Sequence, residues 1–273
     1  MRNMPIGVFD SGVGGLTVVR SLIDRLPREH IVYLGDDARG PYGPRDHEEV
    51  RRFAREIIDY LLGFDVKLVV IACNSATAAA LEEAQRDYNI PVVGVILPGV
   101  RAALGRSTNR RIGVIGTVLT IGSGSYERAV RRLDPQVEVL SQACPEFVDF
   151  VERGEVDGQH IVEVAEGYLA PMVEAGVDTV ILGCTHYPML EELIQRIVGD
   201  GVTLISSADE TAEEVRDILE RLGWDQNNNS AGRRHFLATG DAEKCTGLGR
   251  MFLGPEVKEV IPVSLDVRPD LGF

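Results

Sequence analysis

The chain has 273 residues, enough for one large domain or two of ordinary size, and its 44% apolar and 26% charged residues are typical of a soluble globular protein. The formal net charge of −14 argues against binding to a nucleic-acid backbone, which requires a basic face. The N-terminus shows no long apolar segment with a cleavage signature, and the longest apolar run, VKLVVIAC, is far too short to span a bilayer. We therefore expect a cytoplasmic protein with no nucleic-acid or membrane partner.

Short β-branched runs alternate with amphipathic stretches along the chain, and the runs are almost continuously apolar, as in strands buried on both faces. The predicted strands are Ile6–Phe9, Ile31–Leu34, Leu68–Ala72, Val92–Ile96, Ile112–Ile115, Val137–Leu140, Thr179–Leu182 and Val202–Ile205. The predicted helices between them are Leu16–Arg25, His47–Leu62, Thr77–Asp87, Gly124–Arg132, Ile161–Ala175 and Met189–Ile197. Strand–helix–strand alternation predicts an α/β fold with mostly parallel sheets.

The order of these segments repeats once. IGVFDSG at residue 6 matches IGVIGTV at residue 112, and IVYL at 31 matches VEVL at 137, both at an offset of 106. VVIACNSATAAALEE matches VILGCTHYPMLEELI at an offset of 111, which aligns Cys73 with Cys184, and VVGVI at 92 matches VTLIS at 202. Matches in this order with nearly constant offset predict two similar lobes, related by a pseudo-twofold duplication, with the active site between them.

The end of the chain has no counterpart in the repeat. It contains a predicted helix at Ala212–Leu222, the polar linker GWDQNNNSAGRR, and strands around Phe236–Ala238 and Val257–Val263. We expect these elements to complete the first lobe, and a lobe boundary near Pro98–Arg106. The predicted first lobe is then 1–97 with 208–265, the second is 98–207, and 266–273 is a frayed tail.

Polar and reactive residues follow several of the predicted strands. Sites in open parallel sheets lie beyond the carboxyl ends of the strands. The residues expected there are Asp10, Cys73, Thr117 and Cys184. Because each of these cysteines precedes polar residues and a predicted helix, we expect the helix dipole to lower the thiol pKa. If the lobes face each other, the duplication presents two thiols to one cleft from opposite sides.

The four cysteines have a second interpretation, as small apolar core residues. We favour it for Cys144 and Cys245, whereas the matched positions and polar neighbours of Cys73 and Cys184 favour chemistry. No two cysteines have the spacing of a zinc-binding pair, so no metal site is predicted.

Two facing acid–base groups on either side of one carbon suit a racemase or an epimerase. One thiolate removes the α-proton from one face while the other thiol delivers a proton to the opposite face. Many amino-acid racemases use pyridoxal phosphate bound to a lysine. The chain's lysines, Lys67, Lys244 and Lys258, do not lie in strand-end polar motifs. The sequence therefore favours a mechanism without a cofactor.

The glycine-rich stretch IGVFDSGVGGLT fits this interpretation. A glycine-rich turn between a strand and a helix normally receives an anion, yet this one carries Asp10. An amino-acid substrate bears both signs of charge. Its ammonium group suits Asp10, and its carboxylates suit backbone N–H groups and hydroxyls near Ser11, Ser75, Thr117 and Thr185.

The motifs FDSGVGGLTV, DDARGPYG, ACNSATA, GTVLT and GCTHYPML, spread over roughly residues 5–265, resemble those of the glutamate racemases in the aspartate/glutamate racemase superfamily. The resemblance implies cofactor-independent interconversion of L- and D-glutamate, supply of D-glutamate for peptidoglycan, two α/β lobes around a buried site, and a homodimer. It implies that Cys73 deprotonates one enantiomer and Cys184 the other, with Asp10, Glu152 and His186 as auxiliary catalytic residues. The implied substrate contacts are Asp10, Ser11, Tyr42, Gly43, Asn74, Ser75, Thr117, Thr120, Thr185 and His186.

Most of these residues also have a structural interpretation. Asp10 and Ser11 suit a cap of the helix beginning near Leu16, and Thr117 and Thr120 suit the turn after their strand. Tyr42, in a turn rich in glycine and proline, suits a surface loop. By the same reasoning, Glu152 suits a solvated helix face, and His186 a hydrogen-bonded core position.

Three other functions stay open. The first is racemisation of another amino acid, aspartate above all, which needs a shorter cleft. The second is a nucleotide-binding module, because GVGG after a strand, with Asp36 and Asp37 about twenty residues later, resembles a dinucleotide fingerprint. The third glycine of that fingerprint is replaced by Thr17, and Asp10 would repel a pyrophosphate. The third open function is that of a duplicated binding protein without catalysis, which the paired thiols disfavour.

Overall fold

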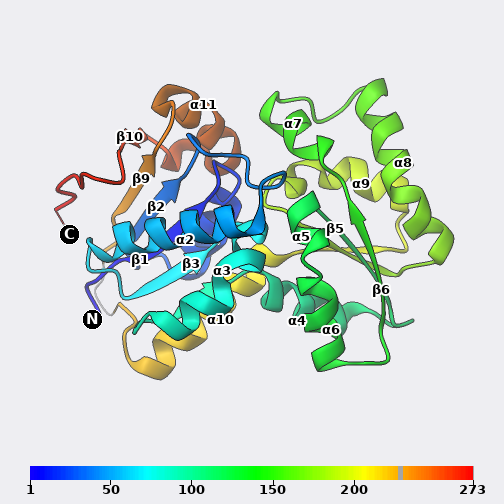
Figure 1. Ribbon diagram of the computed structural model, residues 1–273, viewed down its shortest axis with the longest axis horizontal. Coiled ribbons are helices and arrows are strands. Elements are labelled where there is room, and N and C mark those ends of the chain that lie inside the picture. Colours follow the sequence, from blue (N-terminus) through cyan, green and yellow to red (C-terminus); the bar gives the residue numbers. More distant parts are fainter. Residues whose placement is uncertain (227–229, 273) are drawn as a thin grey trace.

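The computed structural model describes residues 1–226 and 230–272, arranged as two lobes that lie side by side (Figure 1). Residues 227–229 of the predicted linker and residue 273 of the predicted tail lie outside the described residues. The strands of the first lobe are β1 (Ile6–Asp10), β2 (Ile31–Gly35), β3 (Leu68–Ile71), β4 (Val92–Gly94), β9 (Arg234–Ala238) and β10 (Ile261–Pro262). Those of the second lobe are β5 (Arg111–Gly116), β6 (Glu138–Ala143), β7 (Thr179–Gly183) and β8 (Thr203–Ser206).

The strands form two separate sheets, in the orders β10-β9-β2-β1-β3-β4 and β6-β5-β7-β8. Every strand pair in the described part of the chain is parallel. The predicted α/β fold with parallel sheets in two lobes is therefore confirmed. After β8 the chain returns to the first lobe, where β9 and β10 extend the sheet beyond β2.

The duplication is visible in the strand order, since β2-β1-β3-β4 and β6-β5-β7-β8 have the same topology. In the first lobe Ile6 pairs with Leu68, and in the second Ile112 pairs with Thr179. These pairs reproduce the sequence offsets of 106 and 111 for the two central strands of each sheet.

The outer strands are shifted from the predicted alignment by two residues. Ile112 pairs with Val139, not with Val137, where the sequence match to Ile31 places it. The last strand of each repeat is shifted likewise, because Val180 pairs with Leu204 where the match to Val92 requires residue 202. A shift of two residues keeps every side chain on the same face of the sheet, so the apolar pattern cannot reveal it.

Helices cover both faces of each sheet (Figure 1). In the first lobe α1 (Leu16–Arg25), α10 (Ser207–Leu222) and α11 (Ala242–Leu253) pack on one face, and α2 (His47–Leu62) and α3 (Asn74–Asp87) on the other. In the second lobe α4 (Ile96–Arg106) and α6 (Ser125–Leu133) pack on one face, and α7 (Glu146–Glu152), α8 (Gln159–Ala175), the 3₁₀ helix η1 (Tyr187–Leu190) and α9 (Glu191–Val198) on the other. The short helices α5 (Val118–Gly122) and η2 (Gly254–Glu256) complete the structure.

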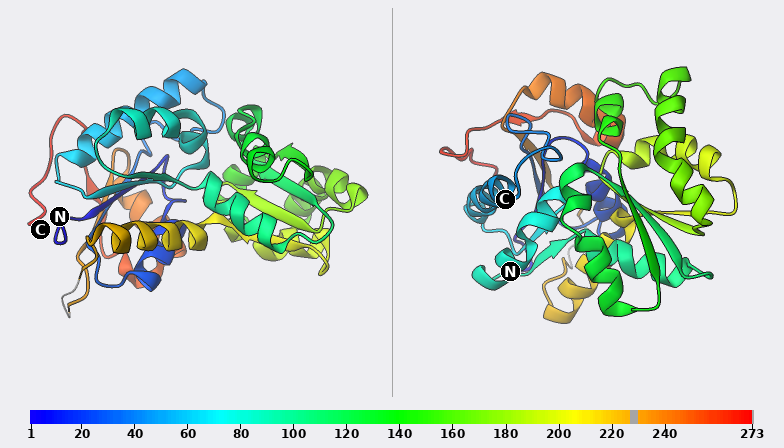
Figure 2. Two further views of the ribbon diagram at one scale, coloured as in Figure 1. Left: turned by 90° about the horizontal axis from the view of Figure 1, so that it is seen from below. Right: turned by 45° about the vertical axis from the view of Figure 1, so that its right-hand side comes forward.

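The expected boundary segment Pro98–Arg106 lies inside α4, which packs on β7 and β8 and alongside α10. Pro98 is tolerated because it lies in the first turn of this helix, where its missing N–H has no intrahelical partner. Figure 2 shows α10 running along the underside of the first lobe toward the second. Since α10 contacts both α1 and α4, it bridges the two lobes.

Several predicted element limits are wrong at their ends. The helices α3 and α10 begin three and five residues earlier than predicted, at Asn74 and Ser207. The strand predicted at Val257–Val263 is reduced to Ile261–Pro262, and α11 was not predicted because its glycines, Gly247 and Gly249, have low helix propensity. Among the described residues no helix has the length and apolar character needed to cross a bilayer.

Candidate active site

The carboxyl ends of β1, β3, β5 and β7 meet where the two lobes face each other, and a small cavity lies between them. Its walls are formed by Ser11, Pro41, Tyr42, Gly43, Cys73, Asn74, Ser75, Thr117, Val148, Cys184, Thr185 and His186. All the predicted substrate contacts except Asp10 and Thr120 are in this set. The cavity volume is about 20 Å³, close to the space of one water molecule, so the lobes are closed on each other.

Cys73 occupies the N-cap position of α3. Its Sγ accepts a hydrogen bond from the N–H of Ala76 at 3.4 Å and donates to Ser11 Oγ at 3.8 Å. Burial and the nearby Asp10 carboxylate raise the pKa of the Cys73 thiol well above its ordinary value, and they outweigh the Ala76 N–H. The expected lowering of this pKa is therefore wrong for the closed structure, because burial outweighs the helix terminus.

Cys184 follows β7, at the position equivalent to Cys73, but no α-helix begins directly after it. The 3₁₀ helix η1 intervenes, and α9 begins only at Glu191. The Sγ of Cys184 lies 3.8 Å from Nδ1 of His186. Cys144 and Cys245 pack in apolar core clusters, as expected.

His186 is buried between the Cys184 thiol and Glu152. Its Nε2 lies 3.5 Å from Glu152 Oε1, an ion-pair distance without hydrogen-bond geometry. Burial acts to lower the pKa of His186, but its contacts with Cys184 and Glu152 outweigh burial and raise the pKa to about 10. The imidazolium so favoured lies within reach of the Cys184 sulfur and can exchange a proton with it.

Asp10 is fully buried and its two carboxylate oxygens have different surroundings. Oδ2 accepts the N–H of Gly15, the residue before α1, at 2.9 Å. Oδ1 is buried and has no hydrogen-bond partner among the described residues. The capping interpretation thus accounts for one oxygen, and the other remains available to a cationic group such as a substrate ammonium.

Gly14, in the turn after Asp10, allows the second lobe to approach closely. A Cβ on Gly14 would lie 2.4 Å from Thr185 Oγ1 and 2.7 Å from His186 Nδ1, both in the second lobe. A Cβ on Gly15 would lie 2.6 Å from Asp10 Cβ within the first lobe. The turn is therefore occupied by side chains of the other lobe and does not cradle a phosphate. This packing disfavours the dinucleotide-binding alternative.

Tyr42 is fully buried, so its interpretation as a surface aromatic is wrong. Its hydroxyl donates to Asp36, which also accepts from Arg39 Nε at 2.7 Å and from Thr239 Oγ1 at 2.8 Å. Gly43 follows, and its carbonyl accepts the N–H of Leu119 from the second lobe at 2.9 Å. Sequence reasoning gave Asp36 no role at the site, although its place just after β2 is the kind of strand-end position that identified Asp10.

Hydroxyl groups connect the lobes across the cavity. Ser75 Oγ, in α3, lies 2.9 Å from Thr117 Oγ1 and 3.2 Å from Thr120 Oγ1. Thr117 also caps α5 by accepting the N–H of Thr120, so its structural and site interpretations hold together. Tyr126, which the sequence analysis did not single out, donates to Asn74 Oδ1 at 2.7 Å.

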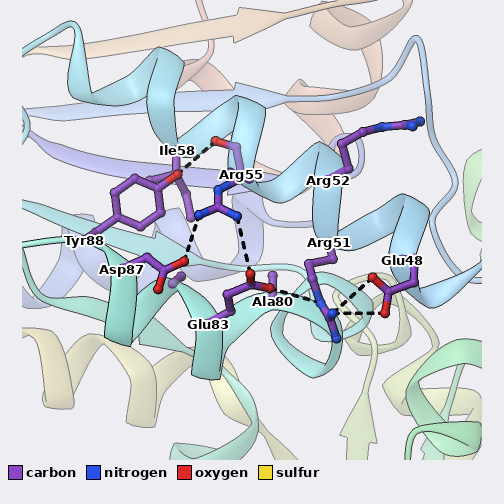
Figure 3. A pocket seen from close by; sticks show the side chains of 10 residues that line it. Glu48, Arg51, Arg52, Arg55, Ile58, Ala80, Glu83, Asp87 and Tyr88 are labelled. Carbon is purple, nitrogen blue, oxygen red and sulfur yellow. Dashed lines mark hydrogen bonds and ion pairs between the residues drawn. The ribbon is translucent and has the colours of Figure 1, made fainter.

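A second hollow lies on the outer surface, between α2 and α3, with a volume of about 270 Å³ (Figure 3). Most of its charged groups are paired with one another, whereas Arg52 pairs with Glu56 outside the hollow. Arg55 lies 3.3 Å from Glu83 and 2.8 Å from Asp87, and Arg51 Nε lies 3.2 Å from Glu83 (Figure 3). Because these charges compensate each other and no thiol or histidine lines the hollow, the cavity between the lobes is the stronger candidate for catalysis.

Known proteins resemble this chain in sequence and in fold. Residues 6–215 match the family model described as Asp/Glu/Hydantoin racemase. A glutamate racemase from Mycobacterium avium (strain 104) is 53% identical over 264 residues, covering 95% of this chain and 96% of the relative.

Two solved structures share the fold. The glutamate racemase isoform RacE1 from Bacillus anthracis has a TM-score of 0.94 and 43% identity, covering 98% of this chain and 100% of that one. The glutamate racemase from Francisella tularensis subsp. tularensis SCHU S4, in complex with D-glutamate, has a TM-score of 0.91 and 36% identity, covering 97% and 99%. Fold, site and sequence together show that the chain belongs to the Asp/Glu/Hydantoin racemase family and, within it, to the glutamate racemases.

Proposed function

We propose that this racemase interconverts L- and D-glutamate with Cys73 and Cys184 as its two acid–base groups and without a cofactor. The observation that carries the proposal is that two thiols, at the ends of the equivalent strands β3 and β7, line one cavity from opposite lobes. In each turnover one thiolate takes the α-proton, the electron pair stays on the α-carbon, and the other thiol protonates the opposite face. The two sulfurs exchange protonation states, so the reverse reaction uses the same groups in the opposite roles.

The neighbouring side chains suggest how glutamate is held. The unpartnered Oδ1 of Asp10 suits the substrate ammonium. The hydroxyls of Ser75, Thr117 and Thr120, now bonded to one another, suit a carboxylate. His186, in contact with Cys184, assists proton transfer on that side, and Asp10 lies close enough to influence the Cys73 thiol.

Closure of the lobes is part of the proposal. Because the cavity holds only about 20 Å³, glutamate enters when the lobes separate and is enclosed when they return. Enclosure removes water from a carbanion that water would otherwise protonate on either face.

A role in cell-wall synthesis is part of the proposal. We propose that it works in the cytoplasm, supplies D-glutamate for peptidoglycan, and forms a homodimer, as the family resemblance implies. Glutamate is preferred to aspartate in this proposal because a curated relative at 53% identity is a glutamate racemase and a solved relative holds D-glutamate.

Circular dichroism of purified, extensively dialysed protein tests this function. With L-glutamate or D-glutamate and no added cofactor, the signal should decay to zero from both starting enantiomers. The value of kcat/KM for aspartate should be lower by about tenfold or more, because one methylene changes the reach to the distal carboxylate. Activity that returned only with an added cofactor, or glutamate binding without racemisation, would contradict the proposal.

A further inference from the structure

Helix α11 lies outside the repeated unit, yet it reaches the second lobe. The Nζ of Lys244, in the first turn of α11, lies 3.7 Å from Glu152 Oε2 at the end of α7. The same Nζ lies 4.0 Å from Asp37 Oδ1, in the loop after β2. In Figure 1, α11 and α7 stand in facing positions on the two lobes. Lys244 therefore joins carboxylates from both lobes.

This ion pair continues into the candidate active site. The other oxygen of Glu152, Oε1, lies 3.5 Å from His186 Nε2, and His186 Nδ1 lies 3.8 Å from Cys184 Sγ. The ring of Phe252, also from α11, contacts the His186 ring edge-on at a centroid distance of 6.0 Å. A continuous series of contacts thus runs from Lys244 through Glu152 and His186 to one of the two thiols.

The other thiol has different neighbours. The hydrogen bonds of Cys73 among the described residues are with Ser11 and Ala76, and neither residue belongs to α11 or to the series from Lys244. A change at Lys244 is therefore expected to reach Cys184 and not Cys73.

Resting on the function proposed above, we propose that Lys244 is a positioning residue that holds the Glu152 carboxylate against His186 and so supports the half-reaction of Cys184. Glu152 has a 29% exposed side chain, and without Lys244 only His186 opposes the turning of its carboxylate toward solvent. Lys244 is itself 48% exposed, so its effect is moderate.

The contacts from Lys244 to Cys184 include several titratable groups, and these determine how elimination depends on pH. Glu152 faces His186, Lys244 and the Cys245 thiol. His186 faces Cys184, Asp10 and Glu152. Contacts with His186 and Lys244 lower the pKa of Glu152, so removing the lysine should raise it.

The kinetics of racemisation alone cannot separate the two half-reactions. L- and D-glutamate are equally stable, so the equilibrium constant between them equals one and kcat/KM is the same in both directions. Elimination from 3-chloroglutamate can separate them. The thiolate removes the α-proton, the Cβ–Cl bond breaks and chloride leaves. The resulting enamine tautomerises and is hydrolysed to 2-oxoglutarate and ammonia. Each α-enantiomer needs one thiol, and Cys73→Ser and Cys184→Ser identify which one.

The experiment compares Lys244→Met with wild type on each enantiomer. The rate of the elimination that depends on Cys184 should fall about fivefold. The acid side of its pH–rate profile should move up by about half a pH unit, because Glu152 becomes easier to protonate. Elimination that depends on Cys73 should stay within about twofold of wild type. Lys244→Arg keeps the charge and should restore the lost activity. Lys258→Met, which removes an exposed lysine beside Ile261 at another surface hollow, should match wild type.

Three results would overturn the inference about Lys244 alone: equal losses for both enantiomers, no loss for either, or no recovery with arginine. A wild-type protein that neither racemises glutamate nor eliminates chloride from either enantiomer would overturn this inference together with the proposed function.

Discussion

The pKa of the buried His186 side chain is set by its neighbours. A histidine surrounded only by apolar groups would be neutral at physiological pH, because burial lowers its pKa. Here the Cys184 thiol and the Glu152 carboxylate reverse that effect and raise the pKa to about 10. Gly14 makes the arrangement possible, since any side chain at this position would collide with the imidazole.

The raised pKa of His186 makes protein stability depend on pH. The folded value of about 10 lies above the ordinary value of 6.5, so the protonated histidine stabilises the folded state fully below about pH 6.5. That stabilisation is lost as the pH rises from 6.5 toward 10. The decrease in Tm over this pH range should therefore be a few degrees smaller in His186→Asn than in wild type. Calorimetry across the range checks it, and an unchanged slope in the variant would contradict the account.

The sequence predicted where the candidate site residues lie better than it predicted their pKa values. Asp10, Cys73 and Cys184 stand at strand ends, and the strand pattern alone places them at one edge of each sheet. The pKa of Cys73 depends on how closely the lobes pack, which no local pattern records. Lys244 gave no signal as a site residue because its partner Glu152 lies far away in the sequence and on the other lobe.

At the scale of elements, a buried ion pair lies at the amino end of the first sheet, opposite the candidate active site. Lys67 precedes β3 at the edge opposite the cavity and is fully buried. Its Nζ lies 2.5 Å from Glu29 Oε2 and donates to the carbonyls of Arg2 at 3.0 Å and Trp224 at 2.9 Å. Because Trp224 follows α10, this lysine binds the segment that returns from the second lobe to the first lobe.

Removing this lysine should destabilise the fold and leave catalysis intact. Lys67→Met leaves the Glu29 carboxylate buried without its cation, which should lower the free energy of unfolding by about 3–5 kcal/mol. The double variant Lys67→Met/Glu29→Gln should recover part of that loss, because no buried charge remains. Urea denaturation measures both, and kcat well below the unfolding temperature should stay near wild type. A single variant as stable as wild type would contradict this role.

The elements that were predicted correctly are those with strong periodicity. The central strands β1, β3, β5 and β7 agree in register with the sequence repeat, because continuous apolar runs define them. The pairing of the outer strands differs by two residues from the sequence alignment. The alternation of side chains between the two faces of a strand does not reveal such a shift. The helices α4 and α11 were missed because proline and glycine in them suggest a loop, while their helical conformation is stabilised by packing on the sheets.

At the scale of the whole molecule, the duplication explains the pairing of the thiols. Two units of the same topology lie side by side (Figure 1). Residues that follow equivalent strands line one cavity from the two lobes. A reaction that must add and remove a proton on two faces of one carbon needs such a pair. The sequence predicted this arrangement from the repeat, but not the closure of the cavity, which depends on contacts such as Ser75 with Thr117.

The returning segment makes the two lobes unequal. Strands β9 and β10 extend the first sheet, and α11 contacts the second lobe at His186 and Glu152. The two thiols therefore have equivalent positions but different surroundings, with a histidine beside Cys184 and a serine beside Cys73. Each half-reaction is expected to respond to its own set of substitutions.

Single-thiol variants test the two-thiol mechanism most directly. Cys73→Ser and Cys184→Ser should each lose glutamate racemisation, because a serine hydroxyl is too weak an acid–base group at neutral pH. Each should still form 2-oxoglutarate from one enantiomer of 3-chloroglutamate, Cys73→Ser from the L-form and Cys184→Ser from the D-form. A swapped pattern would keep the mechanism and reverse only the assignment of faces. Elimination from the same enantiomer by both variants, or racemisation near the wild-type rate by either, would contradict it.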